Sequence, residues 1–312
     1  MGAKKKRRFR RLLCILGVML ALAVGGLYLL VLALLPSAVV YAPNAEKTID
    51  PAQDLSQGKL RALGISRALR VELRSPPASL SCWIVDPPAG PARSTVLALH
   101  GIRDSRRSLL GLGKELARRG HRAVLPDLRG HGRSSGRWLT YGVVESADLV
   151  AVLDRLAAQG LLVEPVKAVG FSYGGAVGLQ LAARDRRVKA VATVATFTSL
   201  RAVVPLYLRR LVPVIGHMVT EGQLDDAVAR AGRLASFDPA RASPLRAIAV
   251  TGARVLLVHG ADDRHIPADH ARELHRAADP GQTRLLIIPG ADHVTIMGHP
   301  RMKRAVLDWM GR

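Results

Sequence analysis

The sequence predicts an α/β fold, with a mostly parallel central sheet covered by helices on both faces, preceded by one transmembrane helix. From about residue 68 onward, short apolar runs alternate with helical stretches, and Gly or Pro residues separate them. Before this region, Leu12 to Leu35 is a run of 24 residues without a charged side chain. The chain has 312 residues, 49% of them hydrophobic, which is enough for a sizeable core and excludes a disordered chain.

The first eleven residues are predicted to be a basic cytoplasmic N-terminus. They hold seven of the Lys and Arg residues, and the other +15 of the net charge of +22 is spread along the chain. Nothing in that spread forms a basic stripe, a basic helix with interleaved aromatics, or a zinc module. We therefore expect an Arg-rich solvated surface and no nucleic-acid partner.

The apolar run at residues 12–35 predicts a membrane anchor. At about 1.5 Å per residue it exceeds a hydrocarbon core of about 30 Å, so it can span with some tilt. A cleaved signal peptide is the alternative, but its apolar part is usually only about 7–15 residues long. The basic cluster predicts a single-pass protein of the cell membrane with the N-terminus cytoplasmic and residues 36–312 outside.

The rest of the chain is predicted as a juxtamembrane linker with one short helix (36–67), followed by one domain (68–312). An antiparallel strand pair opens the domain, and a mainly helical stretch of about 197–247, rich in proline, reads as an insertion rather than a sheet unit. The expected strands are 69–73, 80–85, 96–99, 123–126, 166–170, 188–195, 255–259 and 285–289. The expected helices are 106–119, 143–159, 174–185, 267–277 and 299–311.

Ser172 is the candidate nucleophile. It lies between Gly170 and Gly174, after an apolar strand and before a helix, which is the arrangement of a nucleophile elbow. That turn is so sharp that larger side chains would clash, and it exposes the hydroxyl at the helix N-terminus. A structural turn serine is the alternative, but the strand–turn–helix context favours the elbow.

A serine hydroxyl needs a base, and the base needs an orienting acid. His293 follows the last expected strand in a Gly-containing loop and is the candidate base, while Asp262 or Asp263 follows the preceding strand. Backbone N–H groups of Ile102 and Tyr173 are the candidate oxyanion hole. Two cysteines and no Cys/His cluster with zinc spacing predict no disulfide framework and no zinc site, and the chemistry of a serine triad implies no metal or organic cofactor.

Residues 68–312 resemble α/β-hydrolases of the serine aminopeptidase and monoacylglycerol lipase-like branch, which includes membrane-anchored members. The resemblance rests on five motifs in order over about 245 residues, and it implies Asp263 as the acid, three residues before the pair Ile266-Pro267. It also implies a structural Asp127 and a cap at the insertion. Three arginines near the oxyanion loop depart from the family pattern; they are compatible with an anion site or with the solvated start of a helix, and we favour the second. The five motifs that carry the resemblance are residues 100–101, residues 127–134, the elbow at Ser172, residues 259–267 and His293. The three arginines are Arg103, Arg106 and Arg107.

The leading function hypothesis is a membrane-anchored serine hydrolase that cleaves acyl or lipid esters through Ser172, His293 and Asp263. A peptidase or amidase of the same fold is the nearest alternative, for which Glu221, Asp225 and Asp226 are the only acidic candidates to hold a substrate amine. A catalytically idle binding module tethered to the membrane is a third possibility, which the complete triad disfavours.

Overall fold

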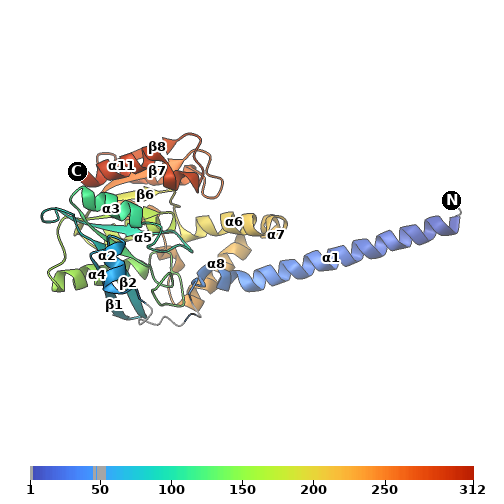
Figure 1. Ribbon diagram of the computed structural model, residues 1–312. Coiled ribbons are helices and arrows are strands. Elements are labelled where there is room, and N and C mark those ends of the chain that lie inside the picture. Colours follow the sequence, from blue (N-terminus) through green and yellow to red (C-terminus); the bar gives the residue numbers. More distant parts are fainter. Residues whose placement is uncertain (1–2, 45–46, 48–53) are drawn as a thin grey trace.

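The computed structural model describes residues 3–44, 47 and 54–312, so residues 45–46 and 48–53 of the predicted linker lie outside the described part (Figure 1). An eight-stranded sheet forms the centre, in the order β1-β2-β4-β3-β5-β6-β7-β8. The first two strands pair antiparallel, β2 is antiparallel to β4, and the remaining pairs are parallel. The predicted mostly parallel sheet is therefore confirmed. The strands are Arg67–Arg74, Pro77–Val85, Thr95–Leu99, Arg122–Pro126, Val166–Phe171, Val188–Val194, Arg254–Gly260 and Thr283–Ile288, β1 to β8 in order.

Helices cover both faces of the sheet, and each face has its own apolar core. One core joins the sheet to α2 (Gln57–Ala62), α3 (Leu110–Arg118) and α11 (Pro300–Gly311). The other face carries α4 (Glu145–Ala158), α5 (Tyr173–Arg184) and α10 (Asp269–Ala277). The strands between them are buried on both faces, as in the all-buried β3 and β5, which is why their sequences read as continuous apolar runs.

The insertion between β6 and β7 is helical, as predicted. It contains α6 (Leu200–Leu211), α7 (Pro213–Met218), α8 (Glu221–Ala235), a 3-10 turn η2 (Pro239–Arg241) and α9 (Pro244–Val250). A second 3-10 turn, η3 (Thr295–Gly298), precedes α11. We call residues 197–247 the cap.

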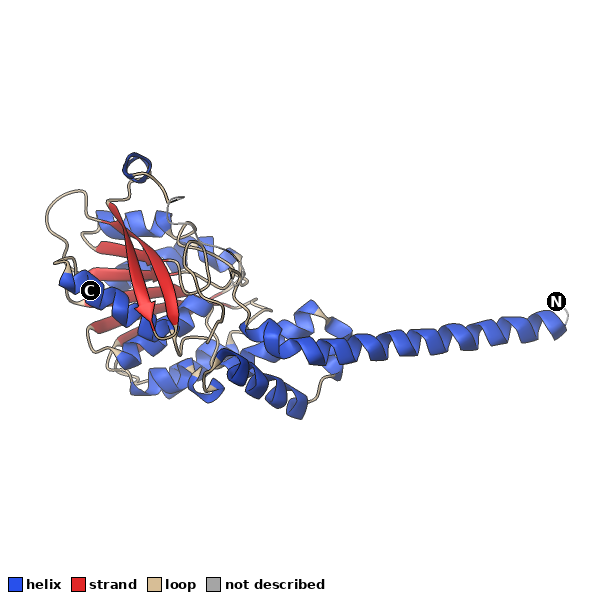
Figure 2. Ribbon diagram, turned by 90° about the horizontal axis from the view of Figure 1, so that it is seen from below, coloured by secondary structure: helices blue, strands red, loops and turns tan. Residues whose placement is uncertain are grey.

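The N-terminal helix α1 is longer than predicted, Ala3–Val40 rather than 12–35, and it projects from the domain as a stalk (Figures 1 and 2). The charged residues before Leu12 end the predicted hydrocarbon span, but they do not end the helix, because Lys and Arg are good helix formers. Among the described residues, one helix, Lys5–Val40, is long and apolar enough to cross a membrane.

The predicted linker boundary at residue 36 is wrong, because residues 36–40 continue α1, and Val39 and Val40 are buried in the domain's core. Leu35, Val39 and Val40 are buried in the same apolar cluster as the cap and α5. Beyond the helix, Ala42 N–H donates to Arg137 O (3.0 Å), and Tyr141 Oη donates to Val39 O (2.9 Å). Packing against the domain, rather than helix propensity, sets this boundary. The expected short helix in the linker is α2.

Candidate active site

Ser172 lies at the carboxyl end of β5, on a strained turn directly before α5. Its backbone has φ 50° and ψ −112°, a conformation that L-residues rarely adopt. Its N–H donates to Val194 O (2.7 Å), which ties the turn to the neighbouring strand β6. The side chain is 2% exposed, and within the described residues its Oγ has no hydrogen-bond partner. A strained, buried and unpaired hydroxyl is unusual in a purely structural turn.

The glycines around Ser172 are required by close backbone contacts. A Cβ on Gly170 would lie 2.3 Å from Gly174 O, and a Cβ on Gly174 would lie 2.4 Å from Leu99 O. These contacts bring the end of β3 against the start of α5, as the expected nucleophile elbow requires.

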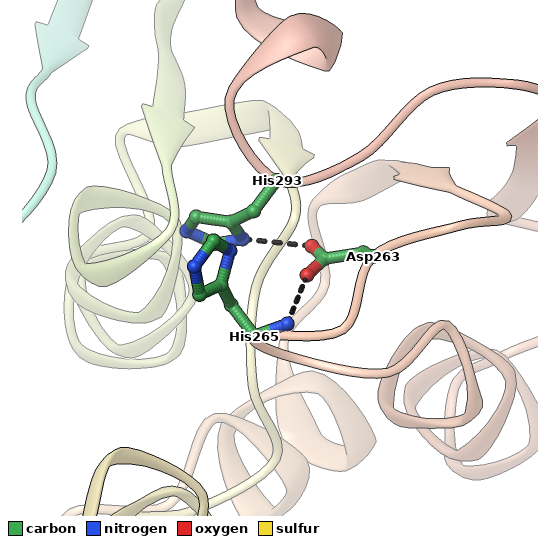
Figure 3. A group of neighbouring side chains, drawn as sticks. All are labelled: Asp263, His265 and His293. Carbon is green, nitrogen blue, oxygen red and sulfur yellow. Dashed lines mark hydrogen bonds and ion pairs between the residues drawn. The ribbon is translucent and has the colours of Figure 1, made fainter. Parts of the chain in front are cut away.

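Asp263 and His293 are brought together at the same edge of the sheet, after β7 and β8. His293 Nδ1 lies 2.7 Å from Asp263 Oδ2, and the ring directs its other nitrogen away from the carboxylate (Figure 3). Asp263 is buried, whereas Asp262 is exposed. The arrangement therefore selects Asp263 as the partner of His293.

The Asp263 carboxylate is held from several sides. Its Oδ1 accepts the N–H groups of His265 (2.8 Å) and Ile266 (2.9 Å), and His259 Nε2 lies 3.3 Å from Oδ2. Burial alone would raise the pKa of Asp263, but hydrogen bonds from His259, His293 and Ile266 outweigh it and place the pKa well below its ordinary value. The carboxylate is thus ionised and fixed in orientation at neutral pH. Sequence reasoning gave His259 no role, although it belongs to the motif at 259–267.

The loop after β3 carries the first predicted oxyanion donor. Within the described residues the Ile102 N–H donates no hydrogen bond, and Tyr173, as the first residue of α5, has no acceptor for its N–H inside the helix. A Cβ on Gly101 would lie 3.9 Å from Ser172 Cβ, so this loop passes close to the nucleophile.

His100 braces the same loop. Its Nε2 accepts the Leu128 N–H (2.9 Å), which leaves Nδ1 protonated and donating to Gly101 O (2.8 Å). Burial lowers the pKa of His100 and keeps the ring neutral.

A third histidine, His265, stands beside the pair. Its ring meets that of His293 edge to face, with centroids 5.2 Å apart. Asp263, His265 and His293 offer metal-binding atoms within 4.8 Å of one another (Figure 3). In the structure, Asp263 uses both oxygens to orient His293 and the loop 263–266.

The three arginines near the oxyanion loop have different roles. Arg106 is buried, donates its N–H to Asp127 Oδ1 (2.7 Å) and places Nε 3.4 Å from Asp127 Oδ2. Asp127 also accepts the Arg133 N–H (2.7 Å), so it has the structural contacts expected of it. Arg107 is exposed at the start of α3, while Arg103 is exposed with φ 60° and faces the cap.

Three acidic residues of the cap, Glu221, Asp225 and Asp226, are already paired. Arg201 of α6 forms ion pairs with Glu221 (2.6 Å) and Asp225, and Arg230 lies 3.6 Å from Asp226. These contacts leave no unpaired carboxylate among the three that the sequence offered as a site for a substrate amine.

Tyr207 on α6 is a site residue that the sequence did not single out. Burial raises the pKa of its phenol, and the neighbouring Ser172 hydroxyl opposes that rise. The two hydroxyls are thus neighbours, although Ser172 Oγ makes no hydrogen bond to a described residue. A tyrosine in an apolar helical run carries no sequence signal for such a position, since it depends on how the cap folds back.

Comparison with known proteins supports the fold. The family model described as alpha/beta hydrolase fold matches residues 94–213. The chain superimposes on the Pyrococcus furiosus esterase Pf2001 with a TM-score of 0.63 at 18% identity, covering 85% of this chain and 97% of the esterase. It superimposes on the Paleococcus ferrophilus monoacylglycerol lipase with a TM-score of 0.54 at 18% identity, covering 74% and 98%. The chain therefore has the α/β hydrolase fold.

Two curated proteins are similar in sequence. Uncharacterized protein YfhR of Escherichia coli K12 is 27% identical over 222 residues, 69% of each chain. Lipase LipV of Mycobacterium tuberculosis H37Rv is 35% identical over 159 residues, 49% of this chain and 55% of the lipase. An esterase and two lipases are thus among the proteins that this chain resembles.

Proposed function

We propose that this protein is a membrane-anchored serine hydrolase that cleaves carboxylic esters, of the monoacylglycerol lipase-like branch. One observation carries the proposal: the buried, unpaired hydroxyl of Ser172 sits on a strained elbow, at the sheet edge where Asp263 orients His293. The esterase and lipase relatives support the ester class, and the paired cap carboxylates disfavour an amine-holding peptidase.

The proposed reaction proceeds through an acyl-enzyme. His293 Nε2 takes the proton of Ser172 as Oγ attacks the ester carbonyl, and the N–H groups of Ile102 and Tyr173 stabilise the oxyanion. The bond from the carbonyl carbon to the alcohol oxygen then breaks, and His293 returns the proton to the leaving alcohol. Water, activated by His293, attacks the acyl-enzyme and releases the acid. No metal or organic cofactor takes part in these steps.

Ester hydrolysis by purified full-length protein tests the proposal. We expect wild-type protein to hydrolyse p-nitrophenyl acetate and Ser172→Ala to lose about 10³-fold or more of kcat. Ser56→Ala, which removes the exposed hydroxyl that caps α2, is the matched control and should keep wild-type activity. A Ser172→Ala protein as active as the control would exclude Ser172 as the nucleophile.

We further propose that α1 anchors the protein in the cell membrane with the domain outside the cytoplasm. The basic residues before Leu12 and the long apolar helix support this orientation. Protease added to intact spheroplasts should remove the domain. If the domain were protected from the protease until the spheroplasts are lysed, the domain would lie in the cytoplasm and the proposed orientation would be wrong.

A further inference from the structure

An apolar groove runs between α1 and the cap helix α6. Its volume is about 490 Å³, within the range of small-molecule sites. Its walls come from segments far apart in the sequence: Leu27, Leu30 and Leu34 of α1, and Val204, Leu208 and Leu211 of α6. The α1 residues recur every three or four positions and so form one face of that helix.

The inner end of the groove reaches residues next to the proposed catalytic centre, although Ser172 and His293 do not themselves line it. Ile102, whose N–H is the proposed oxyanion donor, lines it, and so does Tyr207, whose hydroxyl lies beside that of Ser172. A chain lying in the groove would therefore present its carbonyl end to the nucleophile, with Tyr207 as the side chain that has to move aside.

With α1 as the proposed membrane span, the outer part of the groove lies at the depth of the hydrocarbon core. A hydrocarbon core of about 30 Å takes up about 20 residues of helix, so a span that begins at Leu12 ends near Val31. Leu27 and Leu30 fall within that span. The side chains of residues 5–23 are exposed, and contact with the domain begins at Val24, so little helix separates the domain from the bilayer.

The cap presents apolar side chains at the same level. Leu211 at the end of α6 and Val214 in α7 are 69% and 70% exposed, and α7 lies against α1. Exposed aliphatic residues beside a membrane helix are expected to enter the lipid rather than water. Tyr28 Oη donates to Gln223 Oε1 of α8 (2.8 Å) and fixes α1 against the cap on the other side.

From this juxtaposition we infer that the substrate is a long-chain acyl ester of the bilayer itself, whose chain enters sideways along this groove with α1 as one wall. The helix is then part of the substrate site and not only an anchor. This inference rests on the proposed ester hydrolysis, to which it adds the class of substrate and its route of entry.

The test compares two esters in full-length protein reconstituted into phosphatidylcholine vesicles. The readout is the ratio of kcat/KM for p-nitrophenyl palmitate, incorporated in the vesicles, to that for p-nitrophenyl acetate. Leu30→Trp and Leu27→Trp fill the groove from α1. Each should lower this ratio by roughly tenfold or more, because reducing the space in an apolar pocket changes the preference between a long and a short substrate by about this factor. Leu29→Trp is the matched control: it lies on the same helix outside the groove, is 66% exposed, and should leave the ratio unchanged.

The possible outcomes separate the two proposals. If wild-type protein hydrolyses the acetate ester but neither groove variant changes the ratio, the groove is not the acyl channel while ester hydrolysis stands. An equal fall of the kcat/KM ratio in Leu29→Trp would also refute the groove as the path of the acyl chain. If wild-type protein hydrolyses neither ester, the proposed ester hydrolysis itself fails.

Discussion

Replacing Asp263 by Asn should inactivate the protein while leaving its shape intact, because the two side chains are isosteric. The Asn oxygen will take the place of Oδ1, where it still accepts the N–H groups of His265 and Ile266. The amide NH₂ then faces His293 Nδ1, which must accept instead of donate, so the proton moves to Nε2. In that tautomer His293 cannot take the proton of Ser172.

The expected loss follows from the tautomer. An Asp-to-Asn change at this position of a triad lowers kcat by about 10⁴-fold, or about 5 kcal/mol of transition-state stabilisation. The assay is p-nitrophenyl acetate hydrolysis with Asp262→Asn, the exposed neighbour, as control. An Asp263→Asn protein within about tenfold of that control would refute the assignment of Asp263 as the orienting acid.

Two further predictions concern the elbow and the pH dependence of stability. Gly174→Ala places a Cβ 2.4 Å from Leu99 O and should lower kcat about 10²-fold, because it displaces the oxyanion loop. Gly178→Ala is the control and should be tolerated, because the atom nearest to its Cβ lies 3.5 Å away. Equal kcat values for the two variants would contradict the packing argument. Burial lowers the pKa of His131 from 6.5 to about 4, so the unfolded chain binds the extra proton first, and about 3 kcal/mol of stability present at pH 7 should be lost as the pH falls toward 4. Urea unfolding in detergent at pH 7.5 and 4.5 checks this, and a His131→Phe protein with an unchanged pH dependence would contradict it.

The sheet and the elbow could be predicted because their signals are local. Strands buried on both faces appear as short apolar runs, and the Gly residues around Ser172 mark a turn that other residues cannot adopt. The pairing of His293 with an acid followed from chain order, but the distinction between Asp262 and Asp263 needed either the family pattern or the burial that the structure shows.

What could not be predicted depends on contacts between distant segments. Residues 36–40 read as a linker because nothing in their composition shows that Val39 and Val40 pack into the core. Tyr207 reads as one apolar residue among several until the cap folds back over Ser172. The groove has no sequence signal at all, because its two walls are about 170 residues apart in the chain.

The central claim, that Ser172 is the nucleophile of a serine hydrolase, is tested most directly by a fluorophosphonate probe and mass spectrometry of the labelled full-length protein. A fluorophosphonate reacts with a serine that a neighbouring base activates. We expect one phosphonyl adduct, on Ser172, that disappears in Ser172→Ala and is strongly reduced in His293→Ala. An unlabelled wild-type protein, or an adduct on another residue, would contradict it.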